Sequence, residues 1–119
     1  MKMTNAQMYD SIPVLQQAKD ETGMLGYAIA VNLRRLSTEV EEYARKRDLL
    51  LRSYGTAVEG SAGRYTLTAE DAAAFQRELE PYAKIETEMA VMQVTPEIFT
   101  GGSLTAGQMY ALSWMVKED

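Results

Sequence analysis

The side chains with the clearest chemical potential in this sequence are arginines and tyrosines gathered within one stretch. Tyr43, Arg45 and Arg47 lie at alternate positions, and Arg34 and Arg35 precede them. A guanidinium binds phosphate or carboxylate through paired hydrogen bonds, and a phenol combines apolar area with one hydrogen bond. One interpretation is therefore an anion pocket that holds a phosphate or a nucleotide, formed where two subunits bring these groups together.

A solvated, ion-paired helix surface is the alternative interpretation of the same stretch. Acidic residues lie among the cations: Glu39, Glu41, Glu42 and Asp48. Opposite charges three or four positions apart on a helix neutralise much of each other's field. The charge pattern leaves both interpretations open.

Catalytic and metal-binding chemistry has little support in the composition. The chain contains no His and no Cys, which excludes Ser-His-Asp and Cys-His machinery and imidazole or thiolate metal sites. Glu41 and Glu42 point about 100° apart on a helix, whereas Glu86 and Glu88 share a strand face and could hold a hard cation. Residues 101–103 precede a helix start but lack the Walker lysine and the Rossmann spacing, which favours a loop and an N-cap. We expect no enzyme, no cofactor and no metal site.

Two aromatic residues near the C-terminus are candidate anchors for a protein partner. Tyr110 and Trp114 lie four positions apart, the spacing that places two side chains on one side of a helix. Tyr and Trp are enriched among the residues that dominate binding energy at protein interfaces. If exposed, this pair would contact a partner.

The element expected to position the arginines is one uninterrupted helix over residues 22–54. It contains no proline and Gly55 stands where a helix would stop. Apolar residues recur at steps of three and four along it and form a seam: Ile29, Leu33, Leu36, Val40, Tyr43, Leu50 and Tyr54. Arg47 occupies a position where this pattern predicts an apolar residue.

This seam is too long for the helix predicted after Thr68, which is about half as long and would leave roughly two turns uncovered. A homo-oligomer interface and an antiparallel intrachain partner are both open interpretations. Because something must cover an exposed apolar seam, we expect a homo-oligomer.

The remaining elements complete an α+β, mainly helical fold. Thr4 with Gln7, and Thr105 with Gln108, have the spacing of capping boxes that begin helices. A short hairpin is expected around residues 60–63 and a strand over residues 85–94. The prediction is one domain over residues 1–119, with an N-terminal helical segment over 1–21 and a core over 22–119. That core contains one long helix packed with a second helix, a small antiparallel β element and a short C-terminal helix.

The charge distribution bears on partners and location. Residues 1–60 contain as many acidic as basic side chains, so the net charge of −5 belongs to residues 61–119. An acidic half disfavours general nucleic-acid binding and favours a partner with a basic surface. No stretch has the length and apolarity of a membrane span, and no secretory signal is evident, so we expect a cytoplasmic protein.

Four segments resemble small proteins encoded by tailed bacteriophages and prophages, a family without established activity: GYAIAVNLRRL, EVEEYARKRDLLLRSYG, LTAEDAAAFQRELEPYAKIETEMAV and LTAGQMYALSWMVKED. The resemblance implies a viral origin and action in the host bacterial cytoplasm. We therefore expect a non-enzymatic phage accessory protein that binds and antagonises a host defence protein. The alternatives are an oligomeric sponge that sequesters a nucleotide signal and an accessory protein of phage assembly.

Overall fold

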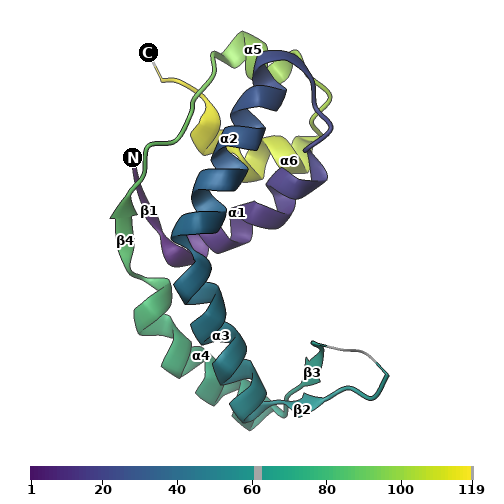
Figure 1. The fold of residues 1–119 in the computed structure, drawn as a ribbon, viewed down its shortest axis with the longest axis vertical. Helices are drawn as coiled ribbons and strands as arrows, with labels where there is room; N and C mark the ends of the chain where they lie inside the picture. Colours follow the sequence, from purple (N-terminus) through teal and green to yellow (C-terminus); the bar gives the residue numbers. More distant parts are fainter. Residues whose placement is uncertain (61–62, 119) are drawn as a thin grey trace.

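Helices make up most of the structure, a computed structural model that describes residues 1–60 and 63–118 (Figure 1). The helices are α1 (Asn5–Gln17), α2 (Gly23–Glu39), α3 (Glu41–Tyr54), α4 (Ala69–Ala83), α5 (Pro96–Thr100) and α6 (Ala106–Ala111), followed by the 3-10 turn η1 (Ser113–Met115). The strands are β1 (Lys2–Thr4), β2 (Thr56–Ala57), β3 (Tyr65–Thr66) and β4 (Glu86–Glu88). The α+β, mainly helical class is confirmed.

The prediction of one uninterrupted helix over residues 22–54 is wrong, because Val40 separates α2 from α3. Its backbone lies at φ −89° and ψ 0°, yet its N–H still donates to Leu36 at 2.9 Å and its carbonyl accepts from Ala44 at 2.9 Å. The two helices therefore continue in nearly one direction (Figure 1). The break follows residues of low helix propensity, including Thr38, whose hydroxyl donates to the Arg34 carbonyl at 3.0 Å.

The chain covers its own apolar seam. Helix α1 packs against α2, and α4 packs against α3 (Figure 1). Five seam residues are buried and only Leu33 and Tyr54 are half-buried; the buried ones are Ile29, Leu36, Val40, Tyr43 and Leu50. The expectation of two uncovered turns is wrong because it omitted α1 as a partner. The seam is an intrachain interface and offers no free apolar face to a second copy.

Two short antiparallel pairs form the β structure. Strand β1 pairs with β4, with Lys2 opposite Glu88 and Thr4 opposite Glu86, and β2 pairs with β3. The expected strand over residues 85–94 is therefore shortened to β4. The expected hairpin is present as β2 and β3, but residues 61–62 of its turn lie outside the described residues.

After β4 the chain runs extended along α2 (Figure 1) and is held there by a buried side chain. Asn32 is fully buried in α2; its amide donates to the Met92 carbonyl at 2.9 Å and its carbonyl accepts from the Met92 N–H at 2.7 Å. Val94 then forms a parallel bridge with Val116. Among the helices described, none has the length and apolar character to cross a bilayer.

Candidate anion-binding cleft

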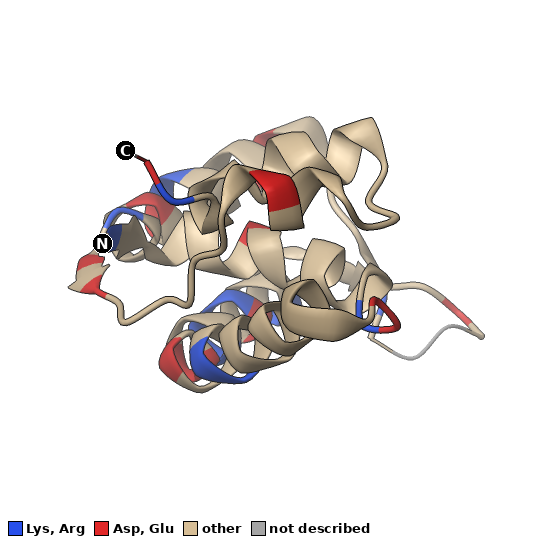
Figure 2. Ribbon diagram, turned by 90° about the horizontal axis from the view of Figure 1, so that it is seen from above, with Lys and Arg blue, Asp and Glu red and all other residues tan. Residues whose placement is uncertain are grey.

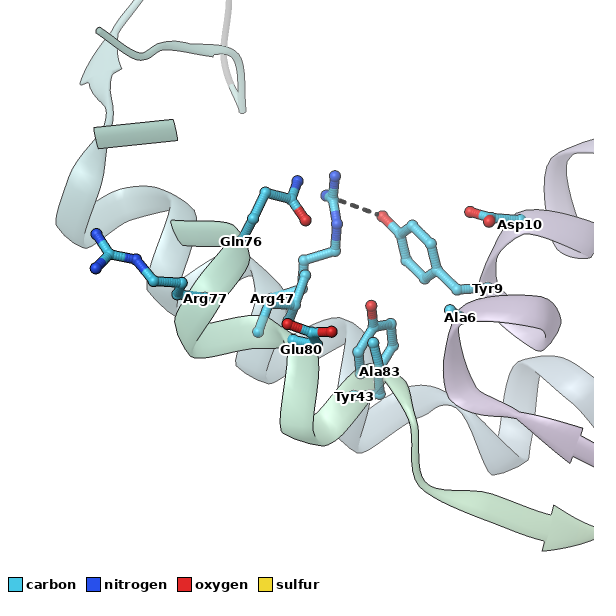
Figure 3. A pocket seen from close by; sticks show the side chains of 10 residues that line it. Ala6, Tyr9, Asp10, Tyr43, Arg47, Gln76, Arg77, Glu80 and Ala83 are labelled. Carbon is cyan, nitrogen blue, oxygen red and sulfur yellow. Dashed lines mark hydrogen bonds between the residues drawn. The ribbon is translucent and has the colours of Figure 1, made fainter. Parts of the chain in front are cut away.

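Helices α1, α3 and α4 line a cleft of about 490 Å³, which we call the Arg47 cleft (Figure 3). Helix α1 contributes one wall, α3 the floor and α4 the opposite wall. The lining residues are Ala6, Tyr9, Asp10, Tyr43, Arg47, Gln76, Arg77, Leu79, Glu80 and Ala83. Of the arginines and tyrosines singled out in the sequence, the cleft unites Tyr43 and Arg47.

Arg47 is the only basic side chain whose head group Figure 3 shows directed between α1 and α4. Its Nη1 donates to the Tyr9 hydroxyl at 3.3 Å, and its guanidinium carbon lies 5.0 Å from the Tyr9 ring centroid and 5.6 Å from that of Phe75. None of the ion pairs found in residues 1–60 and 63–118 includes Arg47. Within the part of the chain that is described, this half-buried guanidinium with five donors therefore makes one long hydrogen bond.

Two tyrosines form the aromatic part of the cleft. The rings of Tyr9 and Tyr43 meet edge to face, with centroids 5.7 Å apart and an interplanar angle of 80°. Burial raises the pKa of the Tyr43 phenol, and the positive charge of Arg47 opposes that shift only in part. Tyr43 is therefore a neutral hydrogen-bonding group at neutral pH and adds no negative charge beside Arg47.

The acidic groups of the cleft are not bound to Arg47. Asp10 lies on the α1 side, and Glu80 on α4 forms an ion pair with Lys84 at 2.7 Å. Arg77 points away from the other labelled side chains in Figure 3. The Arg47 guanidinium therefore defines the cationic end of the cleft, next to the Gln76 amide.

Other arginines of the predicted site lie elsewhere. Arg45 is exposed and ion-paired with Glu41 at 3.6 Å and with Glu42. Arg45 therefore belongs to a solvated, ion-paired helix surface, as the alternative interpretation predicted. Figure 2 likewise shows basic and acidic residues interspersed along the helices instead of one basic face.

Arg34 and Arg35 flank a separate, shallower groove of about 520 Å³ between α2 and the segment after β4. Arg35 donates to the Ala90 carbonyl at 2.5 Å, so it helps to fix that segment. Both side chains are exposed, and Arg34 and Arg35 precede Arg47 by 13 and 12 positions in the sequence. The structure does not bring them together with the Arg47 cleft.

The two aromatic residues near the C-terminus have different environments. Tyr110 is 86% exposed, whereas Trp114 is half-buried and its indole nitrogen is buried without a hydrogen-bond partner among the residues described. Helix α6 ends at Ala111, so the two residues do not share one helix. Tyr110 alone remains a candidate surface anchor.

The loop before the last helix binds an anion from its own chain. The N–H and the hydroxyl of Ser103 both donate to one carboxylate oxygen of Glu21, at 2.9 and 2.7 Å. These hydrogen bonds hold the pKa of Glu21 below its ordinary value. The expected loop and N-cap are confirmed, and Thr105 caps α6 with Gln108 in a capping box.

Sequence reasoning missed the residues that α1 and α4 contribute, above all Tyr9 and Gln76. The signal that pointed to the site was Arg47 itself, a cation at a position where the helical pattern predicts an apolar side chain. In residues 1–60 and 63–118 no three His, Cys, Asp or Glu side chains are placed to hold a metal ion, and Glu86 and Glu88 form no such group. Comparisons of the chain with protein-family models, curated proteins and solved structures find no match.

Proposed function

We propose that this protein acts by binding and not by catalysis, and that the Arg47 cleft holds the phosphate of a nucleotide-sized ligand. The observation that supports this proposal is the half-buried guanidinium of Arg47, which faces the cleft and has no carboxylate bound to it among residues 1–60 and 63–118. Phosphate matches the planar fork of arginine, and a volume of about 490 Å³ lies within the usual range for small-ligand sites. The cleft belongs to one chain, so the proposal needs no second copy.

The resemblance to phage proteins suggests a setting for this activity. A small protein that retains a nucleotide signal in the host bacterial cytoplasm would antagonise a host defence system without turning the ligand over. Binding would be stoichiometric, and the ligand would be recovered unchanged.

The test is calorimetric titration of the protein with adenosine monophosphate and, separately, with inorganic phosphate. The wild type should bind saturably, and Arg47→Met should weaken binding by about tenfold or more, because it removes the cation and keeps an unbranched apolar stem. Arg45→Gln is the matched control, since it removes an exposed arginine from the same helix. Absence of saturable binding by the wild type, or equal losses in the two variants, would refute the site. Conversion of more than one equivalent of nucleotide would refute the non-enzymatic mode.

The stability of Arg47→Met separates a ligand-binding role from a structural one. A half-buried cation without an anionic partner carries a desolvation cost, so its replacement by an apolar residue in the seam should raise the free energy of unfolding by about 1 kcal/mol. Urea denaturation without ligand measures this change. If Arg47→Met instead lowers the free energy of unfolding by a similar amount, the contacts of Arg47 with Tyr9 and Phe75 stabilise the fold.

A second candidate function is binding of a host protein that has a basic surface. The observation that favours it is the charge of residues 61–119, which contain four basic and nine acidic side chains. Complementary charge accelerates association and selects against acidic partners.

A further inference from the structure

The two-stranded sheet of β1 and β4 has an open edge. Strand β1 lies on one side of β4, and no strand lies on the other side in Figure 1. Glu86 and Glu88 are exposed, and Ile85, at the start of the edge, is 51% exposed. This outer edge of β4 is far from the β2–β3 hairpin at the opposite end of the molecule (Figure 1).

The pairing register shows which backbone groups face outward. The Met89 N–H donates to the Met1 carbonyl at 2.8 Å, and the Asn5 N–H donates to the Ile85 carbonyl at 3.0 Å. Inward-facing and outward-facing residues alternate along an antiparallel strand, so the N–H and C=O groups of Glu86 and Glu88 point away from β1. No hydrogen bond joins these four groups to another residue of the part of the chain that is described.

The charges along this edge decide what could pair with it. The Glu88 carboxylate accepts an ion pair from the N-terminal ammonium at 2.6 Å, whereas Glu86 takes part in no ion pair among the residues described. Antiparallel pairing with a second copy of β4 would place glutamates of both chains together, and like charges in opposed strands are destabilising. A second copy is therefore disfavoured, and a basic strand is favoured.

We propose that the outer edge of β4 binds an extended, basic segment of a partner protein by strand addition. The backbone groups of Glu86 and Glu88 supply the ladder, and their carboxylates select Lys or Arg at alternate positions of the incoming segment. Ile85 offers an apolar contact on the opposite face of the strand, where the residues between those cations would lie. This proposal rests on the second candidate function and is independent of the Arg47 cleft.

The probe is a pentapeptide with alternating Lys and Val, blocked at both ends, titrated into the isotopically labelled full chain. Nuclear magnetic resonance should show saturable shifts at the Glu86 and Glu88 amides and slower hydrogen exchange there. The same peptide with N-methyl groups on its edge-facing amides keeps its charge and loses its donors. It should bind about tenfold more weakly or worse, because the ladder cannot form.

Variants of the protein separate the contribution of charge from that of backbone pairing. Glu86→Lys reverses the charge, and Glu86→Pro removes an outward N–H without removing a bond to β1; each should weaken binding by about tenfold. Glu59→Lys is the control, because Glu59 is an exposed acid near the β2–β3 hairpin. If Glu86→Pro does not fold, Glu86→Lys and the N-methylated peptide still decide the question.

Three results would overturn the proposal. Equal affinity of the N-methylated peptide would show attraction by charge alone. No saturable shift at Glu86 and Glu88 would show that the edge does not take a strand. Dimerisation of the wild type that Glu86→Pro abolishes would make a second copy the occupant. None of these results changes the outcome of the nucleotide titrations of the wild type and Arg47→Met. Each proposal can therefore be refuted without refuting the other.

Discussion

Removal of the buried amide of Asn32 should destabilise the fold more than the loss of any exposed hydrogen bond. Asn32 replaces a neighbouring strand for Met92, because its side chain satisfies both the N–H and the carbonyl of that residue. The contact spans 60 positions of sequence and fixes the extended segment after β4 to α2. Asn32→Leu keeps the branched shape of the side chain and removes both hydrogen bonds.

The size of the effect follows from the groups left without partners. Each lost hydrogen bond contributes about 1 kcal/mol net, and each buried backbone group left unsatisfied costs about 1 to 3 kcal/mol. Met92 is half-buried, so water reaches it in part and the lower values apply. Two groups at about 1 to 1.5 kcal/mol each give an expected loss of about 2 to 3 kcal/mol. At about 2.1 cal/mol/K of unfolding entropy per residue, a chain of 119 residues should then melt about 8 to 12 °C lower.

Urea denaturation followed by circular dichroism measures this loss. Asn5→Ala is the matched control, because the Asn5 amide also donates to a backbone carbonyl, that of Tyr82 at 2.9 Å, but at the surface. It should cost less than about 1 kcal/mol. A loss below about 1 kcal/mol for Asn32→Leu would show that the segment after β4 is held by other contacts.

Three further predictions concern the seam, the hydrogen bonds between Ser103 and the Glu21 carboxylate, and two glycines. Leu36→Ala should cost about 2 to 5 kcal/mol in urea denaturation and leave the mass measured by light scattering unchanged, because Leu36 is fully buried inside one chain; dissociation of an oligomer would contradict this. Hydrogen bonds from Ser103 lower the pKa of Glu21, so they stabilise the fold at pH values above the usual pKa of 4.5, and this stabilisation is lost as the pH falls through the lowered pKa. Ser103→Ala should therefore lower the free energy of unfolding at neutral pH. The difference from the wild type in urea denaturation should shrink in acid. Gly26→Ala should cost about 1 to 3 kcal/mol, because its Cβ would lie 2.1 Å from the Glu21 carbonyl oxygen, whereas Gly107→Ala, with no atom within 4 Å, should not destabilise in thermal denaturation.

Features that depend on near neighbours in sequence could be predicted. Thr4 and Thr105 each form the expected capping box, and Thr68 begins α4 by accepting from the Asp71 N–H at 3.1 Å. Such contacts span three residues, so residue types at fixed spacing specify them. The α+β, mainly helical class follows from the same local patterns.

Features that depend on distant segments could not be predicted. The periodicity of the seam showed that residues such as Leu36 face an apolar partner, but the pattern is equally satisfied by α1, by α4 or by a second chain. The break at Val40 could not be predicted, because no proline or glycine marks it in the sequence and helical backbone hydrogen bonds continue through it. The strand predicted over residues 85–94 is shortened to β4 for a related reason. Beyond β4, the backbone N–H and carbonyl of Met92 bond to the side chain of Asn32 and not to a neighbouring strand.

Arg47 shows why a site is harder to predict than a helix. Its position in the seam is a local fact, and it indicates that a cation enters an apolar interface at an energetic cost. The groups that decide what this cation can bind come from α1 and α4, which are separated from α3 in sequence and meet only in the fold. Had α4 placed a carboxylate against Arg47, the same residue would be a buried ion pair with no capacity for a ligand. Because Glu80 instead pairs with Lys84 on its own helix, the Arg47 guanidinium keeps donors for an incoming anion.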